Sequence, residues 1–342
     1  MTISENEPLA PLTTFGIGGP ARFFTEAANE ADVADAVRWS RQRGVPLFVL
    51  GGGSNLLVRD EGFDGLVLHI GIRGVERSGD TFDVGAGENW DPFVQATVDL
   101  GYAGVECLAG IPGSVGGTPV QNVGAYGQEV SETIASVRVL DLATGEFAEL
   151  SNAACRFRYR ESLFNTTERG RYIVTRVRFA LRPGGAANLR YADLQKRFAG
   201  QTAPDLGAVA EAVREIRRAK GMVIVPGDPD TRSAGSFFKN PVVEASALGH
   251  VAAAAGVADK DVPHWSAGEG RVKLAAAWLL ERAGFVKGYG EGSVAISSRH
   301  TLALTNRGGA RFADVARMEG EIVHAVEEKF GVTLVREPVV PG

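Results

Sequence analysis

The sequence predicts an α+β fold in two or three parts, with a glycine-rich half first. Three observations support this prediction. Residues 21–70 alternate β-like and helix-like runs, short strands and turns dominate from residue 71 to about residue 181, and amphipathic helices dominate afterwards. The length of 342 residues suggests about two domains, and 44% hydrophobic with 23% charged residues is ordinary globular composition.

The first part, residues 21–70, reads as a small α/β layer. Asn29 is a good helix N-cap with Asp32 three residues later, Val33 and Val37 form a helical stripe, and Gly44 ends the helix. Short β-like or apolar runs predict the strands around this helix: Ala21–Thr25, Pro46–Leu50, Leu56–Val58 and Leu66–Ile70.

The remaining helices and strands are predicted from the helical period of about 3.6 residues and the strand period of two. A helix over Pro92–Leu100 ends at Gly101, and Leu206–Lys220 is a strong amphipathic helix. Two further helices are predicted over Val272–Arg282 and Phe312–Phe330. The second has apolar residues at three- and four-residue steps, namely Val315, Met318, Ile322, Val326 and Phe330. The predicted strands are Phe82–Val84, Ser136–Leu140, Tyr172–Leu181, Val294–Ile296 and Thr301–Thr305.

Charge and cysteine content exclude several classes of protein. The net charge is −5 and the pI about 5.7, so we expect no nucleic-acid partner. Cys107 and Cys155 cannot form a disulfide framework or a cysteine zinc site, and we expect two free core thiols in a reducing cytosol. Residues 1–11 lack the features of a signal peptide, and apolar stretches such as Leu274–Leu280 are too short for membrane insertion.

Glycine is enriched and clustered. Of the 44 glycines, 22 lie within residues 16–127, a third of the chain. The segment Gly51–Asn55 follows an apolar strand, but its strand-like continuation does not match a Rossmann fingerprint, and no Gly-Lys-Ser/Thr follows any glycine loop. Two interpretations stay open for this segment: a run of main-chain N–H groups that holds a pyrophosphate, or a tight turn.

A second glycine-rich region lies about 60 residues later. It consists of Gly110–Gly117 followed by Gln121–Gly127. Two such runs could bind the two ends of one extended ligand, and the density of small residues and amides favours this over a pair of structural turns.

Three other segments carry candidate chemistry. The alternating run Arg156–Glu161 would place Arg156, Arg158 and Arg160 on one face of a strand, which on its own indicates an exposed charged face. Gly235–Pro241 combines a serine with two aromatic residues, a lysine and an amide, and Glu337 lies near the chain end. No histidine has metal-ligand spacing and no serine-histidine-acid order stands out, so the function is expected to rest on cofactor chemistry.

Together these segments resemble the UDP-N-acetylenolpyruvoylglucosamine reductase family, also called UDP-N-acetylmuramate dehydrogenases, in its class with a substrate-loop tyrosine. The matching pieces come in the family's order and cover nearly the whole chain. They are Thr14–Gly19, Leu50–Leu57, Gly110–Gly127, Tyr159–Ser162, Ala234–Pro241, Val272–Leu280 and Glu337.

The resemblance implies a two-part FAD-binding fold of the vanillyl-alcohol oxidase (PCMH) type, followed by an α+β substrate-binding domain. The implied parts are residues 1–70 with the tail 332–342 packed near them, residues 71–205, and residues 206–331. It further implies a cytoplasmic, monomeric enzyme of peptidoglycan synthesis with non-covalent FAD as cofactor and NADPH as co-substrate. Reduced flavin passes a hydride to the enolpyruvyl group of the nucleotide sugar, and a serine protonates the product.

The resemblance also assigns residues. Arg160, Ser236 and Glu337 are the implied catalytic residues, with Ser236 as the general acid and with Glu337 either protonated or polarising the carboxylate. The implied cofactor-binding residues are Gly51, Gly52, Gly53, Ser54, Asn55, Ile111, Pro112, Gly113, Ser114, Gly117 and Gly124. The implied substrate-binding residues are Tyr126, Tyr191, Arg217, Lys220 and Asn240, with a core aromatic as the alternative for Tyr191; no metal is expected.

Two departures from the family pattern weaken part of this assignment. Gly221–Val225 is inserted between Lys220 and the proline-aspartate turn, and Ser233 stands where asparagine is common. These departures bear on the diphosphate contacts near Lys220.

Two other functions stay open beside the reductase: another FAD enzyme of this fold, such as an alcohol oxidase, and a non-catalytic nucleotide-sugar binder. The joint presence of Arg160, Ser236 and Glu337 favours the reductase.

Overall fold

The computed structural model describes residues 1–341, which fall into two compact units. Unit 1 comprises residues 1–7, 21–53 and 63–219, and unit 2 comprises residues 8–20, 54–62 and the chain from Lys220 onward. Residues 206–219, placed by the sequence at the start of a third part, lie in unit 1. The three-part division itself remains a prediction.

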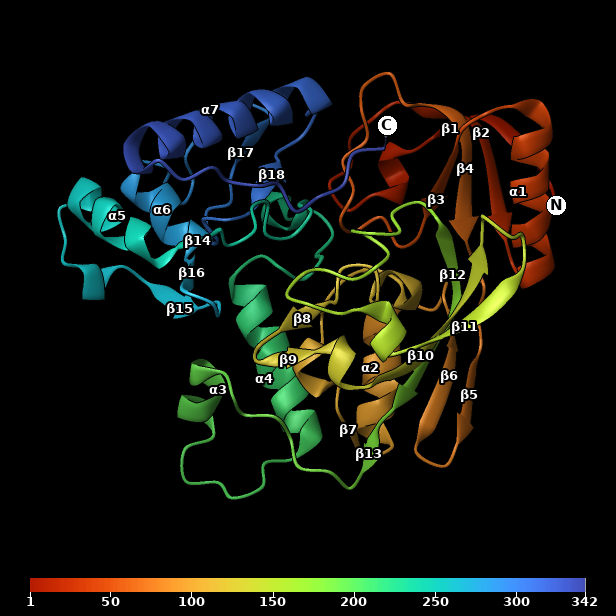
Figure 1. Cartoon of the computed structure of the whole chain (residues 1–342), viewed down its shortest axis with the longest axis horizontal. Helices are drawn as coiled ribbons and strands as arrows, with labels where there is room; N and C mark the ends of the chain where they lie inside the picture. The colour runs from red at the N-terminus through yellow and green to blue at the C-terminus, as the bar shows by residue number, and fades with distance from the viewer. Residues whose placement is uncertain (342) are drawn as a thin grey trace. The chain divides into compact units, whose positions relative to one another are not determined.

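Unit 1 begins with a small sheet flanked by one helix. Its strand order is β1 (Ser4–Pro8), β2 (Pro20–Ala27), β4 (Phe63–Ile70) and β3 (Leu47–Leu50), and both β2 and β3 run parallel to β4. Helix α1 (Glu30–Arg43) connects β2 to β3 and lies beside this sheet in Figure 1. The Asn29 side chain accepts the Asp32 N–H at 3.0 Å, and Gly44 ends the helix with φ +63°. The predicted helix and both of its boundaries are confirmed.

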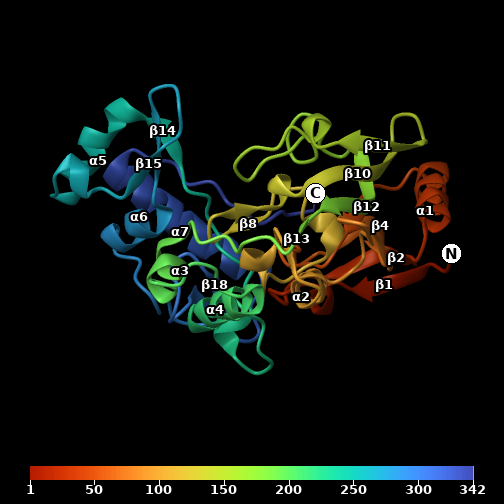
Figure 2. The same ribbon diagram turned by 90° about the horizontal axis from the view of Figure 1, so that it is seen from below.

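The second sheet of unit 1 is antiparallel. Its central strands β10 and β12 pair along most of their length, and the strands lie side by side in Figures 1 and 2. Two strand pairs, β7 with β13 and β8 with β9, lie outside this sheet. The sheet order is β11 (Phe147–Ser151), β10 (Ile134–Asp141), β12 (Tyr172–Ala180), β6 (Thr81–Gly85) and β5 (Val75–Ser78); the pairs are β7 (Tyr102–Ala103) with β13 (Arg182–Pro183), and β8 (Gly124–Ala125) with β9 (Gln128–Glu129).

Three helices complete unit 1. They are α2 (Trp90–Asp99), α3 (Ala192–Arg197) and α4 (Leu206–Ala219). Trp90 and Phe179 lie in the core with ring centroids 5.9 Å apart, and the Trp90 indole donates to the Leu108 carbonyl at 3.0 Å. The burial of Val209 and Val213 confirms the apolar face predicted for α4.

Unit 2 is organised around helix α7 (Phe312–Phe330), whose bounds match the prediction. Helices α5 (Leu248–Ala255) and α6 (Ala276–Arg282) both contact α7 (Figure 1). All five predicted stripe residues of α7 are buried: Val315, Met318, Ile322, Val326 and Phe330. The unit also contains the sheet β14 (Val242–Glu244), β16 (Arg271–Leu274) and β15 (His264–Ser266), and the pair β17 (Val294–Ile296) with β18 (Leu304–Asn306).

The motif Thr14–Gly19 belongs to the core of unit 2. Phe15 is fully buried, and the Asn306 amide donates to its carbonyl at 3.0 Å. The Thr14 hydroxyl donates to the Ser233 carbonyl at 2.7 Å. A Cβ on Gly18 would lie 2.3 Å from Cβ of Val58, so this position requires glycine. The motif therefore has a structural role in the unit that also contains Gly235–Pro241.

Three predicted elements are wrong in type or position. Leu56–Val58 is no strand; Leu56 makes one isolated bridge to Val339. Residues 272–282 were predicted as one helix, but they contain strand β16 followed by helix α6. The first part is a strand because it pairs with β14 and β15, and the periodicity of the segment itself does not reveal this pairing. The strand expected over residues 301–305 is β18, at Leu304–Asn306, where it pairs with β17.

Two negative observations hold for the described residues. No helix among residues 1–341 combines the length and apolar character that crossing a bilayer requires. Within the same residues, histidine, cysteine, aspartate and glutamate side chains form no group of three or more that could hold a metal ion.

Helix α7 offers a direct test of glycine's two roles. Gly320 lies within the helix, and a Cβ there would meet nothing within 4 Å, so Gly320→Ala should raise the free energy of unfolding by about 0.5–1 kcal/mol. Gly331 ends the helix with φ +64°, so Gly331→Ala should lower it by about 1 kcal/mol. Urea unfolding monitored by circular dichroism measures both changes. A change of the same sign in the free energy of unfolding of both variants would contradict these two roles of glycine.

Candidate functional site

The two glycine-rich loops of unit 1 contact each other through their main chains. The Gly52 N–H donates to the Ser114 hydroxyl at 3.1 Å. A Cβ on Gly52 would lie 2.6 Å from Cα of Gly113, and φ is +63° at Gly53 and +126° at Gly113. Steric exclusion and positive φ both require glycine here. The two loops therefore pack directly on each other, and the expectation that they bind one extended ligand remains a prediction.

The second glycine-rich loop, Gly110–Gly117, packs against the end of β6 and also exposes part of its main chain. A Cβ on Gly116 would lie 2.5 Å from Cβ of Ala86, whereas one on Gly117 would reach only the Ser114 hydroxyl, at 3.9 Å. Ile111 and Pro112 are partly exposed. Gly116 therefore allows close packing, whereas Gly117 leaves the main chain accessible to a ligand.

The residues of these loops fit FAD. Successive main-chain N–H groups in turns with alternating φ sign can bind a pyrophosphate. Within unit 1, φ is positive at Gly53, Gly110 and Gly113, which is the turn geometry that such N–H groups require. Ser54 and Asn55 lie in unit 2, where the Asn55 amide donates to the Glu337 carbonyl at 3.3 Å.

Three of the predicted substrate-binding residues come together in unit 1. The rings of Tyr126 and Tyr191 pack edge to face with centroids 5.0 Å apart. Arg217 on α4 is 7% exposed, hydrogen-bonds Tyr126, and donates through Nε to the Gly110 carbonyl at 3.0 Å. Burial lowers the pKa of Arg217, an effect that Tyr126 partly opposes, and burial raises the pKa of Tyr126. A buried guanidinium thus lies beside the second glycine loop.

Arg160 does not lie on a strand, so the predicted face shared with Arg156 and Arg158 is wrong. Arg156 has φ +51° and ends the 3₁₀ helix η5 (Ala153–Cys155). Arg158 and Glu161 then form an isolated bridge that closes a two-residue turn with Arg160 at φ +57°. A period of two predicts a strand only where a partner strand exists, and this segment pairs with itself. Tight turns are a common setting for functional side chains.

Ser236 and Glu337 lie on neighbouring segments of unit 2. The Glu337 N–H donates to the Phe237 carbonyl at 2.8 Å, the Lys239 N–H donates to the Val335 carbonyl at 3.0 Å, and Phe238 bridges Arg336 in antiparallel register. Phe237 and Phe238 are each 1% exposed and anchor this pairing in the core. Ser236 and Glu337 are themselves half-buried. The pairing brings together two of the three predicted catalytic residues, and Arg160 lies in unit 1.

The other two predicted substrate residues lie in unit 2. The Asn240 side-chain oxygen Oδ1 accepts the Ala276 N–H at 2.9 Å, at the first residue of α6. Part of its hydrogen-bonding capacity therefore stabilises a helix start. Lys220 is half-buried directly after α4.

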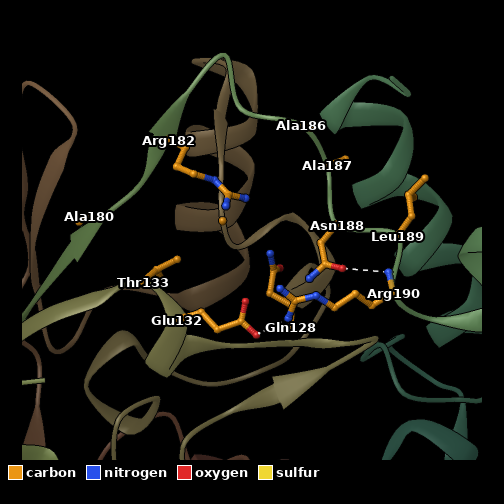
Figure 3. A pocket seen from close by; sticks show the side chains of 11 residues that line it. Gln128, Glu132, Thr133, Ala180, Arg182, Ala186, Ala187, Asn188, Leu189 and Arg190 are labelled. Atoms are coloured by element: carbon orange, nitrogen blue, oxygen red, sulfur yellow. Dashed lines mark hydrogen bonds and ion pairs between the residues drawn. The ribbon is translucent and has the colours of Figure 1, made fainter. Parts of the chain in front are cut away.

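A polar cavity of about 310 Å³ lies in unit 1, and residues 186–190, which directly precede Tyr191, form part of its wall (Figure 3). Arg190 in its wall pairs with Glu132 at 3.0 Å, and Asn188 hydrogen-bonds the Arg190 N–H at 2.9 Å. None of the predicted site residues is among the described residues that line it. The lining is Gly104, Gln128, Glu132, Thr133, Ala180, Arg182, Ala186, Ala187, Asn188, Leu189 and Arg190.

The sequence analysis missed the buried anchor behind this segment. Glu106 is 0% exposed and accepts the N–H groups of Gly104 and Asn188 at 2.7 and 2.8 Å. The neighbouring Cys107 thiol hydrogen-bonds the Asn188 carbonyl at 3.1 Å, and burial raises its pKa. No motif marks Glu106. Gly104 is two residues from Glu106, but Asn188 is 82 residues away, so only the fold reveals that Glu106 anchors this segment.

Two segments of the chain match known protein families. Residues 21–151 match the model of an FAD binding domain, and residues 228–341 match that of the UDP-N-acetylenolpyruvoylglucosamine reductase C-terminal domain. These matches confirm the predicted fold class, an FAD-binding fold followed by an α+β domain.

Relatives of the whole chain and one solved structure carry the same reductase name as the C-terminal match. A UDP-N-acetylenolpyruvoylglucosamine reductase from Streptomyces coelicolor is 52% identical over 99% of this chain and 90% of its own length. That of Thermobifida fusca is 48% identical over 100% and 98%. The crystal structure of the Thermus caldophilus reductase covers 100% of both chains with a TM-score of 0.69 at 27% identity. The chain is therefore an oxidoreductase with an FAD-binding domain and belongs to the UDP-N-acetylenolpyruvoylglucosamine reductase family.

Proposed function

We propose that the chain reduces UDP-N-acetylenolpyruvoylglucosamine to UDP-N-acetylmuramate with NADPH as reductant, as a cytoplasmic step of peptidoglycan precursor synthesis. The observation that carries the proposal is the pairing of residues 237–239 with 335–337, which holds Ser236 and Glu337 on neighbouring segments. The 52% identity to a reductase of this name supports the same substrate.

The residue types suit this chemistry. Bound FAD supplies hydride transfer from NADPH to the vinyl carbon of the substrate. The addition leaves negative charge on the carbon next to the carboxylate, so the reaction needs fixed donors and a proton source. Arg160 binds the carboxylate with its planar fork, Glu337 polarises it, and Ser236 delivers the proton to the carbanion.

The remaining residues hold the nucleotide sugar. Arg217 and Lys220 supply positive charge for the diphosphate, although the overall charge is −5. Tyr126 and Tyr191, already packed on each other, cover the substrate, and Asn240 adds an amide. NADPH and the nucleotide sugar bind in turn, and the enzyme acts as a monomer.

Spectroscopy and a coupled assay test the proposal. We expect a yellow protein with flavin absorbance that oxidises NADPH only when the enolpyruvyl nucleotide is present. Oxygen consumption with an alcohol would indicate an oxidase instead. A protein that takes up no FAD but binds the nucleotide sugar would indicate a non-catalytic binder. Either result would overturn the proposal.

A further inference from the structure

The side chain of Asn122 makes three hydrogen bonds next to the turn that carries Arg160. The residue is 1% exposed and has φ +45°. Its amide nitrogen donates to the Glu129 carboxylate at 2.7 Å and to the Arg158 carbonyl at 2.9 Å, and its amide oxygen accepts the Ser131 N–H at 3.2 Å. Because two partners are pure acceptors and the third is a donor, the orientation of the amide is unambiguous.

These bonds join the β8–β9 hairpin to the turn that carries Arg160. The Arg158 carbonyl, held by Asn122, is one of the two that close this turn. On the other side of the turn, the Asn165 amide donates to the Arg160 carbonyl at 3.1 Å. The turn is thus fixed at both ends by buried or half-buried amides.

The Arg160 guanidinium is directed by the same segment. It donates to the Gly124 carbonyl at 2.6 Å and to the Asn122 main-chain carbonyl at 3.5 Å. A Cβ on Gly124 would lie 2.7 Å from Cγ of Glu129, so this segment accommodates no side chain at that position. Asn122 therefore contacts both the backbone turn and the guanidinium of the same arginine.

We infer that Asn122 is a positioning residue for Arg160: its side chain sets the turn and its carbonyl helps to aim the guanidinium. The inference rests on the proposed catalytic role of Arg160. A non-glycine residue at φ +57° is held only where its surroundings compensate the backbone strain, and the Asn122 bonds provide such compensation. Removing them lets Arg160 relax away from its working orientation.

Asn122→Asp is the sharpest single change. Aspartate keeps the shape and tolerates positive φ, but it cannot donate to Arg158 and it places a second carboxylate against Glu129. We expect oxidation of the reduced enzyme by the enolpyruvyl nucleotide to slow by about 10–100-fold, while flavin reduction by NADPH stays within about threefold of wild type. Anaerobic stopped-flow absorbance measures both half-reactions. If this variant does not fold, Asn122→Gly accepts φ +45° and also removes the side-chain bonds.

Asn152→Ala is the matched control for loss of stability. The Asn152 amide nitrogen also donates to two carbonyls, those of Ser131 and Ile134 at 2.9 and 2.8 Å, and neither carbonyl belongs to the turn that carries Arg160. We expect a comparable decrease in Tm for both variants, and a change of less than about threefold in the half-reactions of Asn152→Ala. Equal slowing in both variants would show that Asn122 acts only through stability and would overturn the inference.

A double-mutant cycle separates the inference from the proposed function. If Asn122 acts through Arg160, then Asn122→Asp should add less than about threefold in an Arg160→Ala background. Fully additive effects would overturn the positioning role. An Arg160→Ala variant with wild-type half-reactions would instead refute the catalytic role of Arg160. A slow Arg160→Ala variant beside a fast Asn122→Asp variant would refute the positioning role alone.

Discussion

Replacing Ser236 by alanine is expected to slow the oxidation of the reduced enzyme by the enolpyruvyl nucleotide by about 10²–10⁴-fold. Reduction by NADPH should stay nearly unchanged, because a proton donor to substrate carbon has no part in that half-reaction. The fold should survive, since Ser236 is half-buried and the pairing beside it is made by main-chain groups of Phe237 and Lys239. Anaerobic stopped-flow absorbance follows each half-reaction separately.

A second serine in the same segment provides the control. Ser233 is buried, and its hydroxyl accepts the Gly235 N–H at 3.3 Å. Ser233→Ala should cost some stability but change the half-reactions by less than about threefold. If Ser236→Ala oxidises at the wild-type rate, Ser236 is not the proton donor.

Replacing Gly52 by alanine should disrupt the contact between the two glycine-rich loops. The new methyl group would lie 2.6 Å from the Ser114 nitrogen and from Cα of Gly113, both main-chain atoms that cannot rotate away. Overpacking of this kind costs about 1–3 kcal/mol, so we expect FAD affinity to fall by about 10–100-fold. Titration of the apoprotein with FAD, followed by flavin fluorescence, measures the change.

Gly320→Ala is the control for this substitution. It makes the same chemical change in helix α7 of unit 2, where a Cβ meets nothing within 4 Å. Its FAD affinity should equal that of the wild type. Unchanged FAD affinity in Gly52→Ala would mean that the loops tolerate separation and do not depend on close main-chain packing for cofactor binding.

Elements with local signals were predicted accurately from the sequence. Helix α1 has its N-cap at Asn29 and its stop at Gly44, and α7 has five apolar residues at helical spacing. Both helices have the predicted bounds because caps and periodicity act within one or two turns of the chain. The family resemblance was also recoverable, since ordered short motifs need no knowledge of contacts.

Elements that depend on a distant partner were predicted poorly. The Val272–Arg282 segment has a helical pattern, but its first residues pair with β14 and β15. The alternating arginines near Arg160 suggested a strand, and the chain turns there because Arg158 bridges Glu161 of the same segment and Asn122 holds Arg158. Periodicity reports which faces are apolar, and only pairing decides whether a strand forms.

The sequence by itself determined the α+β class, the helices with clear caps and the family. The tertiary structure decided where those residues lie: Thr14–Gly19 in the core of unit 2, Ser236 beside Glu337, and Arg160 in a turn held by Asn122. The physical reason is the range of the interactions. Capping and periodicity act between near neighbours in the chain, whereas these contacts join residues separated by 36 to 291 positions and form only when the chain folds.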